Sequence, residues 1–323
     1  MQMEREQMVT TNTGETTMQT PPVKQQSKGN RKLKRTLFLI GMLAPPILQF
    51  LIFFVYVNFN TVLMSFQFRT LESVTWGFGN YVRFFNELGL GRIGNAVKNS
   101  VLIGMNDFLL LTISVVFSYF FYKKIRGAGV FRIIFFLPSI ISIVIFVMAF
   151  KYMFDPKMGI VNYIWEFISG EAAPEWFATT SEYQLPLIMI YCLWVGTGYN
   201  ILIMGGAMAN LPEEVMEYSR LEGVSYFREL FQIVIPMIWP TVSVGILGAF
   251  TTMFTMFLQV ELLTGGGTFH QSTTIAYLIN GIVKGGTDLE WAATLGVCFT
   301  VVAIPIIIIV RKSLEKIGDA LGA

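Results

Sequence analysis

Two long stretches of this chain contain no Asp, Glu, Lys or Arg. They run from Leu185 to Leu211 and from Ile233 to Val260. About 20 consecutive apolar residues are enough for a helix to cross a bilayer, and both stretches exceed that length. Only 14% of the chain is charged, whereas soluble domains carry roughly 25%. We therefore expect an integral membrane protein, and its net charge of +2 does not favour nucleic-acid binding.

Six stretches in all are apolar enough to span a membrane. They are Thr36–Phe59, Asn99–Tyr122, Ile133–Phe150, Leu185–Leu211, Ile233–Val260 and Trp291–Val310. Backbone polar groups in lipid must be satisfied internally, and the alternating pattern of a barrel is absent, so each stretch is expected to be a helix. The Pro45-Pro46 pair predicts a kink or a broken start in the first. The expected fold class is an all-α membrane protein with about six transmembrane helices.

Basic residues gather in three short flanks of these spans. The flanks are Arg31–Arg35, Lys123–Arg132 and Arg311–Lys316. Lys and Arg accumulate on the cytoplasmic side of membrane proteins, so these flanks and both termini are expected in the cytoplasm. The segment Asn210–Pro236, called the charged loop below, then also faces the cytoplasm.

The ends of the chain differ from its middle. Residues 1–35 are polar and rich in Thr, Gln and Lys, which predicts a disordered cytoplasmic tail. Residues 36–312 form the expected transmembrane domain, which contains the charged loop. Residues 313–323 form a short cytoplasmic tail.

The charged loop holds five acids and two arginines between two uncharged spans. Pro212 suits the first turn of a short helix, where its missing N–H costs nothing. Glu213 and Glu214 then lie at the positive end of the helix dipole. Gly223 stands where a left-handed residue ends the helix at little cost. A second short helix, Ser225–Phe231, returns the chain to the membrane, so a rigid helix–turn–helix is predicted.

In this loop the sequence resembles the permeases of binding-protein-dependent ABC importers. Their cytoplasmic loop has the form E-A-A, three residues, Gly, nine residues, I-x-L-P. The same spacing is kept here by Glu217-Tyr218-Ser219, Gly223 and Ile233-Val234-Ile235-Pro236. Tyr218-Ser219 replaces Ala-Ala, and Ile235 replaces Leu.

The resemblance extends from about residue 36 to residue 312. Segments similar to the sugar-permease branch are Gly79-Asn80-Tyr81-Val82, Asn99-Ser100-Val101-Leu102, Phe131-Arg132 followed by Leu137-Pro138, and Leu262-Leu263-Thr264-Gly265-Gly266-Gly267. After the last of these, Thr268 stands where the branch usually has Pro. The alternative is that the charged loop is a solvated connector and the glycines form a simple turn.

The resemblance implies the transmembrane permease of an ATP-driven importer for a carbohydrate, in particular an oligosaccharide. In such importers the loop docks on a cytoplasmic ATPase. The positions expected to couple are Glu213, Glu214, Glu217, Tyr218, Ser219, Arg220, Gly223, Arg228 and Pro236. The implied partners are two copies of an ABC ATPase, a second homologous permease in a heterodimer, and an extracytoplasmic solute-binding protein.

The chain is not expected to be an enzyme. It has no G-x-x-x-x-G-K-[ST] phosphate loop, so ATP and Mg²⁺ are expected in the partner ATPase and no cofactor in this chain. Gly89–Gly94 matches G-x-G-x-x-G, but no predicted strand precedes it. The single histidine, His270, and the two cysteines in apolar stretches, Cys192 and Cys298, offer neither a metal site nor a nucleophile–base pair.

Polar residues in the fourth and fifth spans are candidates for a solute site. Trp194 and Asn200 lie in the fourth, with Thr251, Thr252, Thr255, Met256 and Gln259 in the fifth. Aromatic faces with hydroxyl and amide groups suit the apolar and polar sides of a sugar. From the resembled family, the positions carried over are Gly196, Tyr199, Thr252, Met253 and Met256. The alternative is that these residues serve helix packing.

Other readings remain open. The cargo of a permease of this kind could be an amino acid, a phosphate or a polyamine. A secondary transporter is a different class, and it needs ionisable residues near mid-membrane. The later spans have none, but Asp107 lies in the second span. An ionisable residue there is a functional candidate, although pairing with Asn106 or Lys98 is an alternative.

Overall fold

The structure is a computed structural model that describes residues 28–69, 74–89, 91–267, 271–286 and 288–322. The expectations for the tail up to residue 27, for Thr268 and for His270 lie outside these residues. The chain divides into two units, residues 1–59 and 60–323, which are described separately.

The first unit is a long apolar helix. Helix α1 (Lys28–Gln49) contains Pro45 and Pro46 and runs directly into the π-helix η1 (Phe50–Tyr56). Each proline lacks the N–H that would bond to the carbonyl four residues earlier, and the helix widens into π turns soon after the pair instead of breaking. The helix also includes residues 28–35, which composition alone assigns to the tail. None of the η1 residues is buried, which suits a lipid-facing helix.

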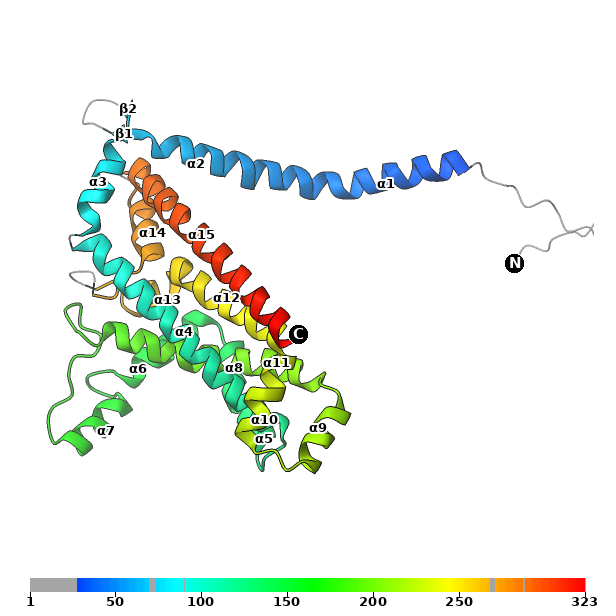
Figure 1. Cartoon of the computed structure of the whole chain (residues 1–323). Helices are drawn as coiled ribbons and strands as arrows, with labels where there is room; N and C mark the ends of the chain where they lie inside the picture. The colour runs from blue at the N-terminus through cyan, green and yellow to red at the C-terminus, as the bar shows by residue number, and fades with distance from the viewer. Residues whose placement is uncertain (1–27, 70–73, 90, 268–270, 287, 323) are drawn as a thin grey trace, which may run out of the picture. The chain divides into compact units, whose positions relative to one another are not determined.

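The second unit is almost entirely helical (Figure 1). It begins within α2 (Val57–Ser65), followed by a hairpin of β1 (Gln67–Arg69) and β2 (Val74–Trp76) in which Gln67 pairs with Trp76. The helices that follow are α3 (Gly79–Leu88), α4 (Arg92–Tyr122), α5 (Ala128–Ile140), α6 (Ile143–Met153), α7 (Ile160–Ser169), α8 (Gln184–Ala209), α9 (Glu213–Leu221), α10 (Tyr226–Glu229), η2 (Leu230–Val234), α11 (Ile235–Met237), α12 (Trp239–Thr255), α13 (Leu258–Leu263), α14 (Ile275–Gly285) and α15 (Leu289–Leu321).

The expected number of spans agrees with the described helices. Four are long and apolar enough to cross a membrane: Lys34–Ser65, Arg92–Tyr122, Gln184–Ala209 and Leu289–Leu321. Two bent helix pairs raise the number to 6 if each pair is one span. The all-α class with about six spans is confirmed.

The third predicted span, Ile133–Phe150, is not one helix. Helices α5 and α6 meet at an angle of 108°, because Ile141 adopts an extended conformation with ψ 142°. Pro138, three residues earlier, cannot donate to the helix. Helix α5 also approaches α8 so closely that a Cβ on Gly198 would overlap the carbonyl oxygen of Phe135. The prediction that this stretch forms one helix is therefore wrong.

The fifth predicted span, Ile233–Val260, is interrupted twice. The run Tyr226–Met237 bends by 84° into α12, and Ile238 at the bend stands between two prolines that have no N–H to donate. At the other end Met256 is extended. Its carbonyl accepts a hydrogen bond from the Thr274 hydroxyl (2.7 Å), so a backbone group released from the helix is satisfied inside the protein.

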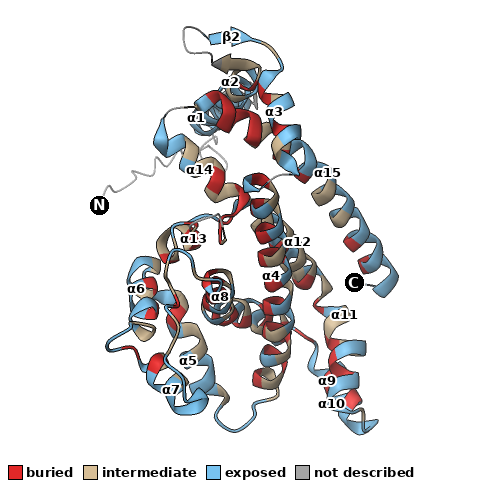
Figure 2. Cartoon of the chain, turned by 90° about the vertical axis from the view of Figure 1, so that its left-hand side faces the viewer, coloured by how far each residue is buried: buried red, intermediate tan, exposed pale blue. Residues whose placement is uncertain are grey.

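The centre of the second unit is the contact between α4 and α8. Figure 2 shows buried residues along both helices. Small polar side chains of α4 donate to α8 carbonyls: Ser118 to Ile201 (3.0 Å) and Asn106 to Met189 (3.2 Å). Hydroxyl and amide groups commonly join membrane helices in this way. Residues of α4 and α8 also support the charged loop and line the cavity described next.

Candidate functional site

The first half of the charged loop is the helix α9, which ends in a left-handed glycine. Gly223 has φ +66°. Its N–H donates to the carbonyl of Arg220 (3.1 Å), and the next N–H, of Val224, donates to that of Ser219 (3.2 Å). This pair of bonds is the Schellman arrangement. The predicted glycine stop is confirmed, but Pro212 caps the helix from outside it (ψ 126°) and does not lie in its first turn.

The second half of the charged loop differs from the predicted helix Ser225–Phe231. Helix α10 is α-helical only as far as Glu229, and the backbone then forms the π turns of η2 before Pro236 in α11. The proline removes one N–H from the regular ladder, and the wider turns precede it directly. The loop therefore re-enters the transmembrane part through an irregular helix.

A buried ion pair joins the charged loop to the end of α4. The Nζ of Lys123 lies 2.5 Å from Oε1 of Glu229, and only 8% and 3% of the two side chains are exposed. The other carboxylate oxygen of Glu229 accepts from the Ser219 hydroxyl (3.2 Å) in α9. One carboxylate thus connects both helices of the loop to α4.

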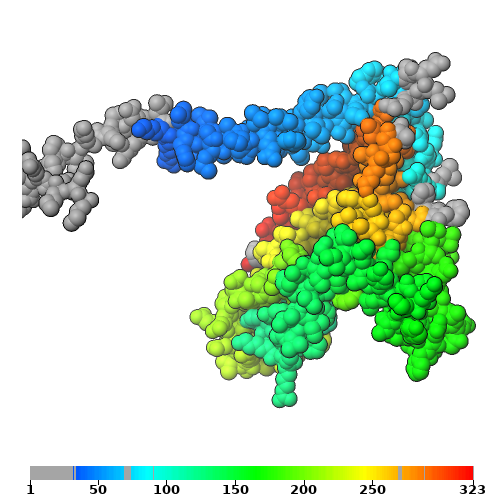
Figure 3. All heavy atoms as spheres, turned by 180° about the vertical axis from the view of Figure 1, so that it is seen from behind, coloured from blue at the N-terminus to red at the C-terminus, as the bar shows by residue number. Residues whose placement is uncertain are grey.

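Most of the positions expected to couple to an ATPase face outward. Glu213, Glu214, Glu217, Tyr218, Arg220, Gly223 and Arg228 are exposed, Pro236 is half-buried and Ser219 is buried. The inward face carries Met216, which belongs to one apolar cluster with Leu230 and Val234 of η2 and Tyr119 of α4. In Figure 3 the loop, yellow-green, lies at the surface of the second unit. Its outer face therefore combines acids with exposed aromatic side chains.

A cavity of about 420 Å³ lies among α4, α5, α6, α8, α12 and α13. Its lining residues are Asp107, Leu110, Leu111, Pro138, Ser139, Ile141, Ile143, Tyr191, Cys192, Val195, Gly196, Asn200, Gly245, Gly248, Ala249, Thr252, Met256 and Gln259. Of the predicted solute positions, five line it: Gly196, Asn200, Thr252, Met256 and Gln259. The two helices flanking the charged loop therefore both contribute to one cavity.

The other five predicted solute positions do not line this cavity: Thr251 and Thr255, and the three positions Trp194, Tyr199 and Met253. Trp194 packs edge-on against Phe146, with ring centroids 5.0 Å apart. Tyr199 is 56% exposed. Met253 packs on α4, where a Cβ on Gly104 would lie 2.9 Å from its Cε. In the structure of this chain these three side chains have packing or surface environments.

Asp107 lies in the cavity wall, although sequence reasoning leaves its role open. Its carboxylate is within hydrogen-bonding reach of Thr252 in α12. Asn106 faces elsewhere and donates to α8. Ser139 also lines the cavity and is not predicted from the sequence. It lies near the end of α5, and the bend between α5 and α6 brings it to the cavity.

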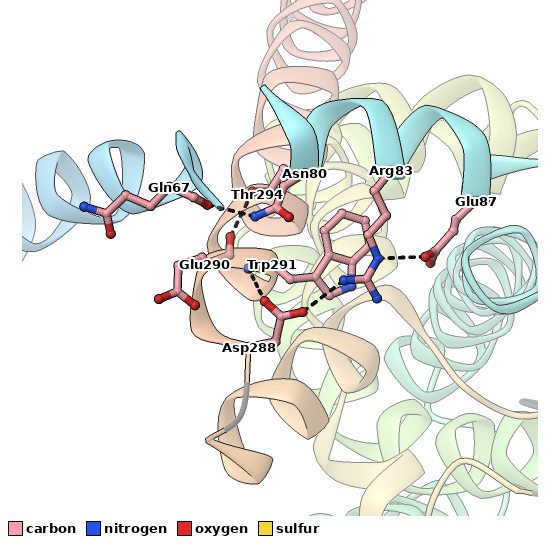
Figure 4. Close-up of polar contacts among 8 residues, drawn as sticks. All are labelled: Gln67, Asn80, Arg83, Glu87, Asp288, Glu290, Trp291 and Thr294. Atoms are coloured by element: carbon pink, nitrogen blue, oxygen red, sulfur yellow. Dashed lines mark hydrogen bonds and ion pairs between the residues drawn. The ribbon is translucent and has the colours of Figure 1, made fainter. Parts of the chain in front are cut away.

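A second polar cluster joins α3 to the start of α15 (Figure 4). The Arg83 guanidinium bonds to Glu87 (2.8 Å) and to Asp288 (2.9 Å), and its Cζ lies 4.2 Å above the ring of Trp291. Burial lowers the pKa of Arg83, but the bonds and charges of the two carboxylates outweigh it, and the pKa is raised above its ordinary value. The cluster thus holds a permanently charged arginine between two helices.

The glycine run after the fifth span is a compact turn. Gly265, Gly266 and Gly267 all have positive φ (62°, 83° and 69°). The Tyr277 hydroxyl donates to the carbonyl of Gly265 (2.7 Å), and a Cβ on Gly267 would overlap the buried side chain of Gln184. Glycine is required here by both backbone angle and space.

A family model described as "Binding-protein-dependent transport system inner membrane component" matches residues 109–316. The match covers most of the chain, including the charged loop, and the chain belongs to this family. The family resemblance predicted from the loop spacing is confirmed, and with it a membrane protein that crosses the bilayer several times.

Curated relatives are named as sugar permeases. The maltose/maltodextrin transport system permease protein MalF of Escherichia coli (strain K12) is 25% identical over 205 residues, which is 62% of this chain and 40% of MalF. The alpha-glucoside transport system permease protein AglF of Rhizobium meliloti (strain 1021) is 24% identical over 282 residues, 82% of this chain and 79% of AglF. The chain thus spans about 40% of the length of MalF.

The fold is also that of a solved transporter. The structure titled as a bacterial ABC transporter involved in the import of the acidic polysaccharide alginate contains a chain with TM-score 0.75 and 21% identity. The match covers 90% of this chain and 99% of that chain. At this identity the likeness concerns the fold.

Proposed function

We propose that this chain is a permease subunit of an ATP-driven importer and forms part of the path for a carbohydrate. The observation that carries the proposal is the charged loop, which has the family spacing, a rigid Schellman end at Gly223, and an outward face built on a buried base. The sugar-related names of MalF and AglF support the cargo class. An oligosaccharide fits a cavity of about 420 Å³ lined by neutral polar groups and one carboxylate.

In this proposal the charged loop transmits the closure of the ATPase to the cavity. The loop connects directly to α8 on one side and, through the bend at Ile238, to α12 on the other. Residues of both helices line the cavity. Movement of the loop as a rigid element therefore moves two cavity walls together.

The partners follow from the same proposal. ATP and Mg²⁺ are bound by two copies of a cytoplasmic ATPase, a second homologous permease completes the path, and a solute-binding protein delivers cargo from outside. The two termini and the charged loop lie in the cytoplasm. The Lys123–Glu229 contact supports this orientation, because it places the basic 123–132 connection beside the charged loop.

The test is association with the ATPase. Gly223→Pro removes the N–H that closes α9 and imposes a negative φ where +66° is required, and Glu217→Lys reverses an exposed charge. Both variants should insert into the membrane but lose ATPase co-purification. Glu315→Lys, at an exposed position of α15, is the control. Retention of the ATPase by both loop variants would contradict the proposal.

A second candidate function, ion-coupled secondary transport, is favoured by one observation: Asp107 is an ionisable group in the cavity wall. The two functions differ in their energy source. Uptake by vesicles should persist with a proton ionophore when ATP is maintained. Collapse of uptake under those conditions would favour the secondary transporter instead.

A further inference from the structure

The cavity has one charged group among its described lining residues. That group is Asp107; the lining contains no Lys, Arg or His. The other lining side chains with hydroxyl or amide groups are neutral: Ser139, Tyr191, Asn200, Thr252 and Gln259. The electrostatic character of this part of the path is therefore set by a single carboxylate.

Hydrogen bonding in the wall around Asp107 favours ligands that donate. An ionised carboxylate only accepts hydrogen bonds. The Thr252 hydroxyl has one proton and two acceptors within reach, the carbonyl of Gly248 (3.1 Å) and the Asp107 carboxylate, so acceptor capacity is left over at this wall. A ligand hydroxyl or ammonium group satisfies these acceptors, whereas a ligand carboxylate leaves them unsatisfied and adds repulsion.

Tyr191 has a buried hydroxyl group beside the cavity. It borders the cavity and is 1% exposed, and its buried hydroxyl has no hydrogen-bond partner within the described part of the chain. Buried hydroxyl groups are nearly always paired in folded proteins. This hydroxyl oxygen has almost no accessible surface in the structure, so a molecule in the cavity pairs with it only after the wall moves.

We propose that Asp107 selects the charge class of the cargo. Neutral and amino-bearing saccharides are accepted at this wall, and saccharides that carry carboxylates are rejected. The inference rests on the proposed function, because it treats the cavity as part of the transport path. The likeness to the alginate transporter does not decide the point, since at 21% identity the two chains share the fold while side chains differ.

The first test measures the electrostatic potential directly and needs neither transport nor a known cargo. Cys192 and Cys298 are the only cysteines, so Cys192→Ala with Cys298→Ala gives a cysteine-free chain into which Ser139→Cys places one thiol in the cavity. The thiol is modified with cationic and with anionic methanethiosulfonate reagents on the full chain in membranes. Each rate is divided by that of a small free thiol.

The expected result is at least a tenfold normalised preference for the cationic reagent. Asp107→Asn should reduce the preference to within twofold of unity, and Asp107→Glu should keep it. Asn200→Cys, in α8, is a second reporter in the cavity lining and should behave alike. Ser313→Cys, at an exposed position of α15, is the control whose ratio should not respond to Asp107→Asn. A preference that is absent, or that persists in Asp107→Asn, overturns the assignment.

A second test examines the cargo class. Maltotriose, a neutral probe, should slow modification of Ser139→Cys, while trigalacturonate, an anionic probe, should not. Protection by trigalacturonate with Asp107 intact overturns the selection. Protection that trigalacturonate acquires only in Asp107→Asn supports it. If neither sugar protects but the charge preference depends on Asp107, the electrostatic assignment stands and the carbohydrate part of the proposed function fails.

Discussion

Lys123 and Glu229 form an ion pair of 2.5 Å whose side chains are 8% and 3% exposed. Lys123 directly follows α4, and Glu229 ends α10, so the pair joins a transmembrane helix to the charged loop. The Lys123 ammonium also lies 5.6 Å from the ring centroid of Tyr119 and 5.9 Å from that of Tyr226. The loop is thereby attached to α4, which it does not follow in sequence, as well as to α8 and α12.

Glu229→Gln should destabilise the protein strongly. It leaves the Lys123 ammonium buried without a counter-charge, and breaking a buried pair in this way costs about 3–5 kcal/mol. Thermal unfolding of the purified protein in detergent measures the effect. The reversed pair, Lys123→Glu with Glu229→Lys, should recover part of the loss.

The matched control for that prediction is Glu315→Gln. Glu315 pairs with Arg311, but the two side chains are 57% and 69% exposed, so the pair contributes at most about 1 kcal/mol. Equal losses of stability in Glu229→Gln and Glu315→Gln would show that the buried pair contributes no more than the exposed one.

Ser219 should tolerate alanine but not leucine. The Ser219 side chain lies on the inward face of α9, is 2% exposed and contacts the carboxylate of Glu229. Alanine loses one hydrogen bond to a charged group, at about 1.5–3 kcal/mol, but keeps the packing, whereas leucine is too large for this buried position and pushes α9 away from Glu229. ATPase co-purification should survive Ser219→Ala and fail in Ser219→Leu. Equal behaviour of the two variants would show that the loop does not depend on this close contact.

Gly198→Ala should disturb the contact of α8 with α5. The added methyl group overlaps the Phe135 carbonyl oxygen, and overpacking of this kind costs about 1–3 kcal/mol. Gly206→Ala on the same helix is the control, because a Cβ there meets nothing within 4 Å. Unfolding temperatures of the two variants should differ; a Gly198→Ala protein as stable as Gly206→Ala would contradict the packing.

Arg83→Ala should loosen α3 with a smaller effect than Glu229→Gln. The Arg83 and Asp288 side chains are 42% and 34% exposed, so solvent screening limits the loss to about 1 kcal/mol. Limited proteolysis should cleave the 67–98 connection faster in Arg83→Ala than in the wild-type protein. Because the pKa of Arg83 is raised in the folded protein, its contribution is complete at neutral pH and is lost only as the pH rises through that elevated value. The proteolysis rate of the Ala variant relative to wild type should therefore be the same at pH 7 and pH 9.

Features set by neighbouring residues could be predicted. The absence of charge over long runs identified the apolar spans, because a bilayer imposes a length and a polarity on each helix. Gly223 identified the end of α9, because a left-handed residue is a local requirement. The family spacing of the charged loop could also be predicted, because all of its residues lie in one continuous segment of the sequence.

Other features depend on contacts between distant segments, and only the tertiary structure decided them. From the sequence, Lys123 is interpreted only as one of the basic residues that set the membrane orientation. In the structure it pairs with Glu229, because α4 ends beside the charged loop. The sequence does not decide the role of Asp107, because its place in the cavity depends on how α4 meets α12. Trp194 looked suited to a sugar and packs on Phe146 instead, because the bend at Ile141 brings α6 to that face of α8. Composition determines that helices enter the membrane, but the side chains that meet between them are determined by the bends and close approaches of the packed fold.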